Sequence, residues 1–71
     1  MPLEDYLEIP LEGYKPPFDF ITLLCDKGLA DDEYPETNGW EVDYWKYFDY
    51  EGVAYIVSGS MYYGTYSIKQ R

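Results

Sequence analysis

The sequence predicts an α+β fold, in which one helix packs on a three-stranded antiparallel β-sheet and an extended N-terminal arm precedes the helix. Three observations predict it: an amphipathic segment at 17–27, an alternating run at 40–50, and two further strand-like runs that end at residue 70. A chain of 71 residues has room for one small domain, so we expect residues 1–71 to form a single acidic unit. Because 46% of the residues are hydrophobic and 21% are aromatic, the chain can bury enough surface to fold.

The first sixteen residues are the predicted arm. Leu7, Ile9 and Leu11 recur at a strand period, and Pro10 confines such a strand to an edge of the sheet or to an extended arm. Leu3, Leu7 and Leu11 also have helical spacing, but Pro10 would break that helix. We therefore expect this segment to be extended.

The helix is predicted at residues 17–27. Pro16 and Pro17 suit the start of a helix, where proline is tolerated. One face with i, i+3, i+4 spacing consists of Phe18, Ile21, Leu24 and Cys25. Gly28 supplies a left-handed cap after the helix, and Leu29 supplies the apolar contact that often follows such a cap. A strand remains the alternative, because apolar residues also alternate through this segment.

A loop and the first strand of the sheet are predicted next. Residues 30–39 combine acids, a proline and an Asn-Gly turn signal, which is typical of an exposed loop. The strand at 40–50 alternates, so its inner face is formed by Trp40, Val42, Tyr44 and Phe48. Its outer face is formed by Glu41, Asp43, Trp45, Tyr47 and Asp49. This outer face combines carboxylates with two large aromatic rings.

Two further strands complete the predicted sheet. A turn at 50–52 leads to a strand at 53–57, which is apolar on both faces and is therefore expected at the centre of the sheet. A second turn at 58–60 leads to the third strand at 61–70, with Gly64 as a candidate bulge. The predicted core consists of Ile21, Leu24, Val42, Phe48, Ile56 and Val57.

The composition excludes several classes of function. Fourteen acids stand against five basic residues, a net charge of −9, which excludes nucleic-acid binding through a phosphate-neutralising surface. The sequence has no histidine and a single cysteine, Cys25, so Ser-His and Cys-His nucleophiles, His-ligated zinc and intrachain disulfides are excluded. Because so short a chain also leaves little room for a pocket, we expect no enzyme activity, no cofactor and no metal site.

The location is predicted from two further features. The amino-terminal residues lack the basic region and the apolar run of a signal peptide, and the apolar stretches are too short for a transmembrane helix. An unpaired cysteine suits a reducing compartment. We therefore expect a cytoplasmic protein that does not associate with membranes.

The negative charge is concentrated in residues 1–51, which hold all fourteen acids and three lysines, a net charge of −11. Alternate side chains on a strand lie about 6.6 Å apart, so acids on one strand face can imitate a row of phosphates. Aromatic residues among such acids are the types that anchor interfaces. The candidate partner-binding residues, here called the candidate acidic surface, are Asp31, Asp32, Glu33, Glu36, Glu41, Asp43, Trp45, Tyr47, Asp49 and Glu51.

In length, acidity, aromatic content and lack of catalytic groups, the chain resembles the phage-encoded anti-CRISPR and anti-restriction proteins, several of which imitate DNA. The eight acids of the candidate acidic surface are the features that support the resemblance. It implies an inhibitor in the bacterial host cell that binds a basic nucleic-acid-binding protein, either a CRISPR-Cas complex or a restriction nuclease. Lys46 among the acids, and the absence of acids after residue 51, depart from this pattern.

Two other functions remain open on the sequence. An immunity protein or antitoxin that neutralises a basic nuclease toxin would need the same kind of acidic surface. An interaction subunit without an inhibitory role is the third reading. If the acidic face is not the binding site, we expect recognition on the neutral, tyrosine-rich segment at 61–69.

Overall fold

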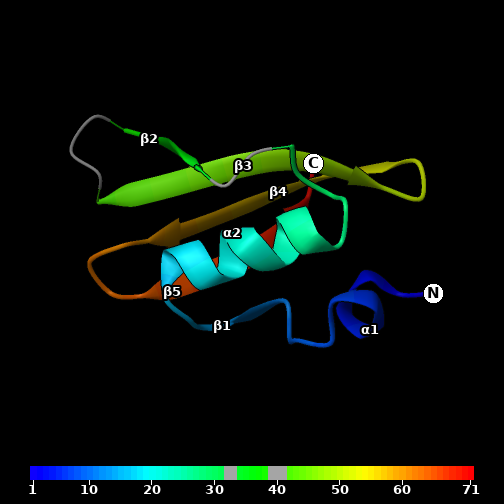
Figure 1. Ribbon diagram of the computed structural model, residues 1–71, viewed down its shortest axis with the longest axis horizontal. Helices are drawn as coiled ribbons and strands as arrows, with labels where there is room; N and C mark the ends of the chain where they lie inside the picture. The colour runs from blue at the N-terminus through cyan, green and yellow to red at the C-terminus, as the bar shows by residue number, and fades with distance from the viewer. Residues whose placement is uncertain (32–33, 39–41) are drawn as a thin grey trace.

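The protein is a single antiparallel sheet with two helices on one of its faces (Figure 1). The computed structural model describes residues 1–31, 34–38 and 42–71, without the side chains of Pro17 and Phe18. In chain order the elements are α1 (Leu3–Leu7), β1 (Glu12–Tyr14), α2 (Pro17–Asp26), β2 (Glu36–Thr37), β3 (Asp43–Tyr50), β4 (Val53–Ser60) and β5 (Thr65–Gln70). The strand order is β1-β5-β4-β3-β2, and every neighbouring pair is antiparallel.

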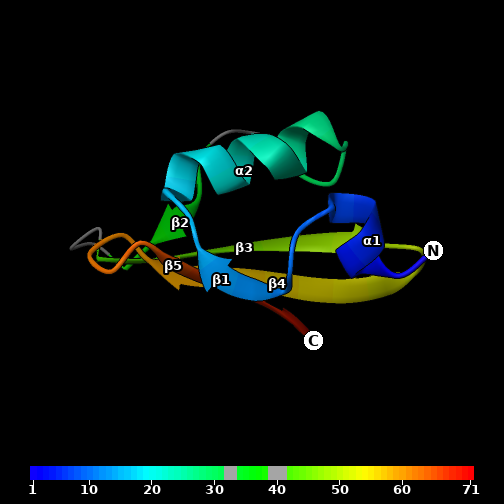
Figure 2. The same ribbon diagram turned by 90° about the horizontal axis from the view of Figure 1, so that it is seen from below.

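The two faces of the sheet differ in what covers them. Figure 2 shows α1 and α2 on the same side of the sheet, and no described element lies on the opposite side. We call these the covered face and the open face. Neither helix, in the part of the chain that the structure describes, is long and apolar enough to cross a membrane.

The predicted fold class is wrong, because the sheet has five strands and there are two helices. The predicted three-stranded meander is present as β3, β4 and β5, and it forms the centre of a larger sheet. At one edge β1 pairs with β5, and at the other β2 pairs with β3. Strands of two or three residues are too short to show an alternating pattern, so the sequence does not reveal them.

The N-terminal segment begins with a helix and is not an extended arm. Leu3 and Leu7 lie one helical turn apart on α1 and are both buried against the sheet. Glu8 ends the helix in a left-handed conformation, with φ of 60°. The chain has therefore left the helix before it reaches Pro10, so the proline interrupts nothing. The Tyr6 hydroxyl donates a hydrogen bond to the Lys27 carbonyl oxygen at 2.9 Å, which ties α1 to the end of α2.

The helix predicted at 17–27 is present as α2. Gly28 has φ of +77° and caps it as expected, and the Leu29 backbone N–H donates to the Leu24 carbonyl at 2.9 Å. Phe20, Ile21 and Leu24 are fully buried against the sheet, whereas the predicted apolar face omitted Phe20. Its ring stacks on Tyr66 with 4.3 Å between ring centroids. Cys25 is only partly buried at the margin of the core.

The predicted turn at 50–52 is confirmed, but the one at 58–60 is wrong. Glu51 and Gly52 both have positive φ, at 50° and 80°, which matches the turn that joins twisted strands with two residues. Strand β4 continues through 58–60, and the turn falls at 61–64. Gly64, with φ of +68°, belongs to that turn and is not a strand bulge.

Gly59 lies within a strand because the Tyr44 ring and the Thr65 carbonyl oxygen occupy the space beside it. It pairs with Tyr44 on β3 and Tyr66 on β5, both buried on the covered face. A Cβ atom at this position would collide with the Tyr44 hydroxyl and with the Thr65 carbonyl oxygen. The glycine that resembled a turn signal therefore makes room for packing.

The predicted core is partly correct. Ile21, Leu24, Phe48 and Val57 are buried as expected. Two other members are not in the core: Val42 is 42% exposed ahead of β3, and Ile56 is only half-buried. Ile56 lies on the open face, where it pairs with Tyr47 of β3. The prediction for Trp40 falls outside the described residues.

Two buried tyrosines should make the fold less stable at alkaline pH. Burial raises the pKa of Tyr44 and Tyr66 above the usual 10.0, and for Tyr44 the neighbouring Tyr66 adds a smaller contribution. Above that value the unfolded chain loses these protons while the folded chain keeps them. Stability is therefore complete below about pH 10 and is expected to fall as the pH rises further.

This dependence can be measured as the melting temperature by circular dichroism between about pH 8 and about pH 12. Tyr44→Phe removes one of the two groups, so its melting temperature should decline less steeply than that of the wild type. The other tyrosines and the lysines are present in both proteins. The effect of Tyr44 is therefore measured as the difference between the two proteins in how steeply the melting temperature falls with pH. Equal slopes would contradict the role of Tyr44.

Candidate functional site

The open face contains most of the described members of the candidate acidic surface. Residues paired across an antiparallel sheet share a face, so the register assigns each strand residue to one side. The covered face holds the buried residues of the strands: Tyr44, Phe48, Val57, Tyr66 and Ile68. The residues between them form the open face, and they are Glu12, Tyr14, Glu36, Asp43, Trp45, Tyr47, Asp49, Ala54, Ile56, Ser58, Ser60, Thr65, Ser67 and Lys69.

Strand β3 presents the sequence acid, aromatic, aromatic, acid on this face, which we call the β3 row. Asp43 and Asp49 are exposed, Tyr47 is 49% exposed and Trp45 is half-buried. The predicted outer face of this strand is therefore confirmed over 43–50. The prediction for Glu41 falls outside the described residues.

The remaining members of the candidate acidic surface are less concentrated. Glu36 on β2 lies directly opposite Trp45, so it joins the open face beside the β3 row. Glu51 is exposed in the turn after β3, where its Oε1 lies 3.7 Å from the N-terminal amino group. Asp31 is exposed in the connection after α2 and belongs to no strand. Asp32 and Glu33 fall outside the described residues.

Three charged residues that the sequence analysis missed also lie on the open face. Glu12 joins it from β1 and Lys69 from β5. Arg71, just beyond β5, places its guanidinium carbon 4.4 Å from the centre of the Tyr47 ring. The sequence contained a signal for the two cations, because alternation from Tyr66 and Ile68 places every second residue on the opposite face. The open face therefore has mixed charge and is not uniformly acidic.

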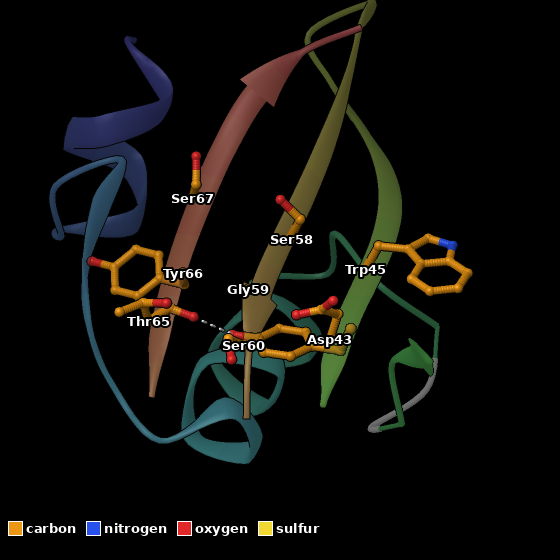
Figure 3. A pocket seen from close by; sticks show the side chains of 9 residues that line it. Asp43, Trp45, Ser58, Gly59, Ser60, Thr65, Tyr66 and Ser67 are labelled. Carbon is orange, nitrogen blue, oxygen red and sulfur yellow. Dashed lines mark hydrogen bonds between the residues drawn. The ribbon is translucent and has the colours of Figure 1, made fainter. Parts of the chain in front are cut away.

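A shallow depression of about 400 Å³ crosses β3, β4 and β5 on this face, toward the end of the sheet next to the 61–64 turn (Figure 3). Its floor consists of small residues, with Ser58, Ser60 and Ser67 contributing hydroxyl groups. Figure 3 shows the Asp43 carboxylate beside this floor and the Trp45 indole turned away from it, toward the edge of the sheet. The Ser67 hydroxyl oxygen is shielded from solvent and makes no hydrogen bond. The arrangement suits contact with a flat or extended polar group.

The helices form a second acidic surface that the sequence analysis did not anticipate. We call it the helical acidic surface, and its exposed members are Glu4, Asp5, Glu8, Asp19 and Asp26. Among the described side chains of the two helices no aromatic ring is exposed, since Tyr6 is half-buried under the Lys27 ammonium group, 5.3 Å from its ring centre. Most of the described acids are therefore divided between two opposite sides of the molecule.

The described carboxylates share one property: all eleven are exposed. Two of them have a polar partner: Glu51 has the N-terminal amino group, and Asp43 accepts a hydrogen bond from the Asn38 side-chain amide at 3.3 Å. The other described carboxylates make no hydrogen bond or ion pair. Nowhere in the described chain do three potential metal ligands come together.

Comparison of the chain with protein-family models, with curated proteins and with solved structures finds no match.

Proposed function

We propose that the protein is a small acidic inhibitor that acts in the bacterial cytoplasm. It binds the cationic nucleic-acid-binding surface of a defence system, a CRISPR-Cas complex or a restriction nuclease, and competes there with the nucleic acid. The observation that supports this proposal best is the exposure of every described carboxylate, nearly all of them without an intramolecular partner. That the protein is not an enzyme stays a prediction.

Unpartnered carboxylates favour a cationic partner on energetic grounds. Eleven exposed acids repel one another in a chain of net charge −9, and a surface rich in arginine and lysine would relieve that repulsion. Complementary charge also speeds association, with an effect that weakens as salt shortens the Debye length from about 10 Å at 0.1 M to about 3 Å at 1 M. Binding should therefore be strongly salt-dependent.

We assign the contact to the open face and not to the helical acidic surface. Charge alone gives steering, whereas tight interfaces depend on a few aromatic or arginine side chains that become buried. The open face supplies Trp45 and Tyr47 between Asp43 and Asp49, and the described side chains of the helices include no such exposed anchor. The half-exposed Tyr47 ring can lose solvent contact only when a partner covers it.

The test compares two charge reversals that change the net charge equally. Asp43→Lys with Asp49→Lys alters the open face, and Asp19→Lys with Asp26→Lys alters the helical acidic surface. Partners are first captured from a bacterial lysate on the wild-type protein and identified, and each variant is then assayed for binding the purified partner in competition with DNA. We expect the open-face variant to lose at least about 100-fold in affinity, since close charge pairs at interfaces contribute about 1.5–7 kcal/mol each.

The control variant should lose much less, because it alters only long-range attraction. All four side chains are exposed, so circular dichroism should show both variants folded. Equal losses would mean that recognition is not confined to the open face, and unchanged binding of the open-face variant would contradict the assignment. A captured nuclease toxin in place of a defence protein would favour the immunity-protein alternative.

A further inference from the structure

We infer that the open face binds arginine side chains of its partner, and that the Asp43–Trp45 half of the β3 row is the site for one guanidinium group. The inference rests on the proposed function, since it names the side chain that the basic partner contributes. Three features support it: a guanidinium that already lies on this face, the repeated composition of the β3 row, and the free hydrogen-bonding capacity of Asp43.

Arg71 shows how this face holds a guanidinium. Its side chain lies over Tyr47 with 4.4 Å to the ring centre, and its backbone N–H donates to the Ala54 carbonyl at 2.9 Å. Ala54 pairs with Asp49 on β3, so Arg71 and Asp49 lie on opposite sides of Ala54 in the sheet. One arginine of the chain itself therefore lies over the Tyr47 ring, in the Tyr47–Asp49 half of the β3 row, without forming an ion pair with Asp49.

The other half of the β3 row has the same components in reverse order. Asp43 and Trp45 are two residues apart on β3, as Tyr47 and Asp49 are, and they lie on the same face. Glu36 lies opposite Trp45 and adds a second carboxylate beside the indole. Among the described residues, no cation lies over the Trp45 ring and none is within ion-pair distance of Asp43. This half can therefore accept a cation from outside.

Asp43 has hydrogen-bonding capacity left for such a group. Its side chain accepts one hydrogen bond from the Asn38 amide at 3.3 Å, whereas an ionised carboxylate can accept about four. A guanidinium group can donate two parallel hydrogen bonds to a carboxylate and can stack flat on an aromatic ring. A lysine ammonium is more strongly hydrated and does neither. The site should therefore prefer arginine to lysine.

The experiment titrates the whole protein with two capped peptides of equal charge, one of four Arg-Gly repeats and one of four Lys-Gly repeats. The indole N–H signal of Trp45 in NMR spectra reports binding, and its assignment comes from the Trp45→Phe variant. We expect the arginine peptide to bind about three to ten times more tightly, the range that a partly solvated cation–π contact supplies. Equal affinity for the two peptides would overturn the inference.

Two matched variants locate the site. Asp43→Asn and Asp19→Asn each remove one exposed carboxylate, from the open face and from α2. We expect Asp43→Asn to lower the affinity for the arginine peptide and to reduce the preference for arginine, whereas Asp19→Asn should keep that preference. If both variants behave alike, the peptides respond only to net charge and the inference is wrong.

Arg71→Ala supplies an independent outcome. It exposes the Tyr47–Asp49 half of the β3 row and removes a cation, so it should bind the arginine peptide more tightly, by about two- to fivefold. A weaker or unchanged affinity would contradict the idea that Arg71 occupies an equivalent site. The outcomes also separate the two proposals. If the protein prefers the arginine peptide but does not compete with DNA for a captured partner, only the proposed function is contradicted. If it competes with DNA but shows no preference for arginine, only this inference is contradicted.

Discussion

Replacement of Phe20 by alanine is expected to lower the free energy of unfolding by about 3–5 kcal/mol. Phe20 is fully buried on α2, and its ring stacks on Tyr66 at 4.3 Å between centroids. Loss of a buried phenylalanine side chain costs about 3–5 kcal/mol. A domain of this length is stable by only about 4–10 kcal/mol, so the substitution removes much or all of the stability.

Urea denaturation followed by circular dichroism would measure this loss. Thr22→Ala is the matched control, because Thr22 is exposed on the same helix and should change the stability by less than about 0.5 kcal/mol. Cooperative unfolding of Phe20→Ala at the urea midpoint of the wild type would show that α2 does not depend on this contact.

The second large effect is expected for Gly59→Ala, although the change adds a single methyl group. The new Cβ atom would lie 2.6 Å from Tyr44 Cζ and would also collide with the Thr65 carbonyl oxygen, which belongs to the backbone of β5. Relief would require the β4 and β5 strands to separate or the Tyr44 ring to leave the core. We expect a loss of about 2–3 kcal/mol, in the upper part of the range for overpacked sites.

Thermal unfolding of Gly59→Ala and Ser58→Ala distinguishes this steric effect from a general sensitivity of β4. Ser58 is the preceding residue on the same strand, and its side chain lies on the open face where a smaller group meets nothing. Ser58→Ala should therefore melt close to the wild type. Similar melting temperatures for the two variants would mean that the space beside Gly59 is not needed for packing.

The two acidic surfaces change how the charge of this chain is understood. The sequence places the acids together in residues 1–51, but the fold divides most of the described ones between the open face and the helical acidic surface. It also moves Lys69 and Arg71 from the acid-free end of the chain onto the open face. A partner would therefore meet a patterned surface on one side and a plain acidic one on the other.

The sequence by itself determined the elements whose signals are local. The spacing of Ile21 and Leu24, with Gly28 after them, was enough to predict α2, because a helix and its cap depend on neighbours within one or two turns. The division of β3 into two faces followed from its alternation in the same way. The central position of β4 followed from its apolar residues on both faces.

Only the tertiary structure decided the edges of the sheet and the content of the open face. The three residues of β1 and the two of β2 are strands because longer strands offer them backbone hydrogen bonds, and so short a segment has no periodicity of its own. Gly59 looked like a turn because its sequence neighbours are serines, while its real constraint comes from Tyr44 and the Thr65 carbonyl oxygen on other strands. The guanidinium of Arg71 meets Tyr47 for the same reason: residues far apart in the chain become neighbours through strand register, which local sequence does not encode.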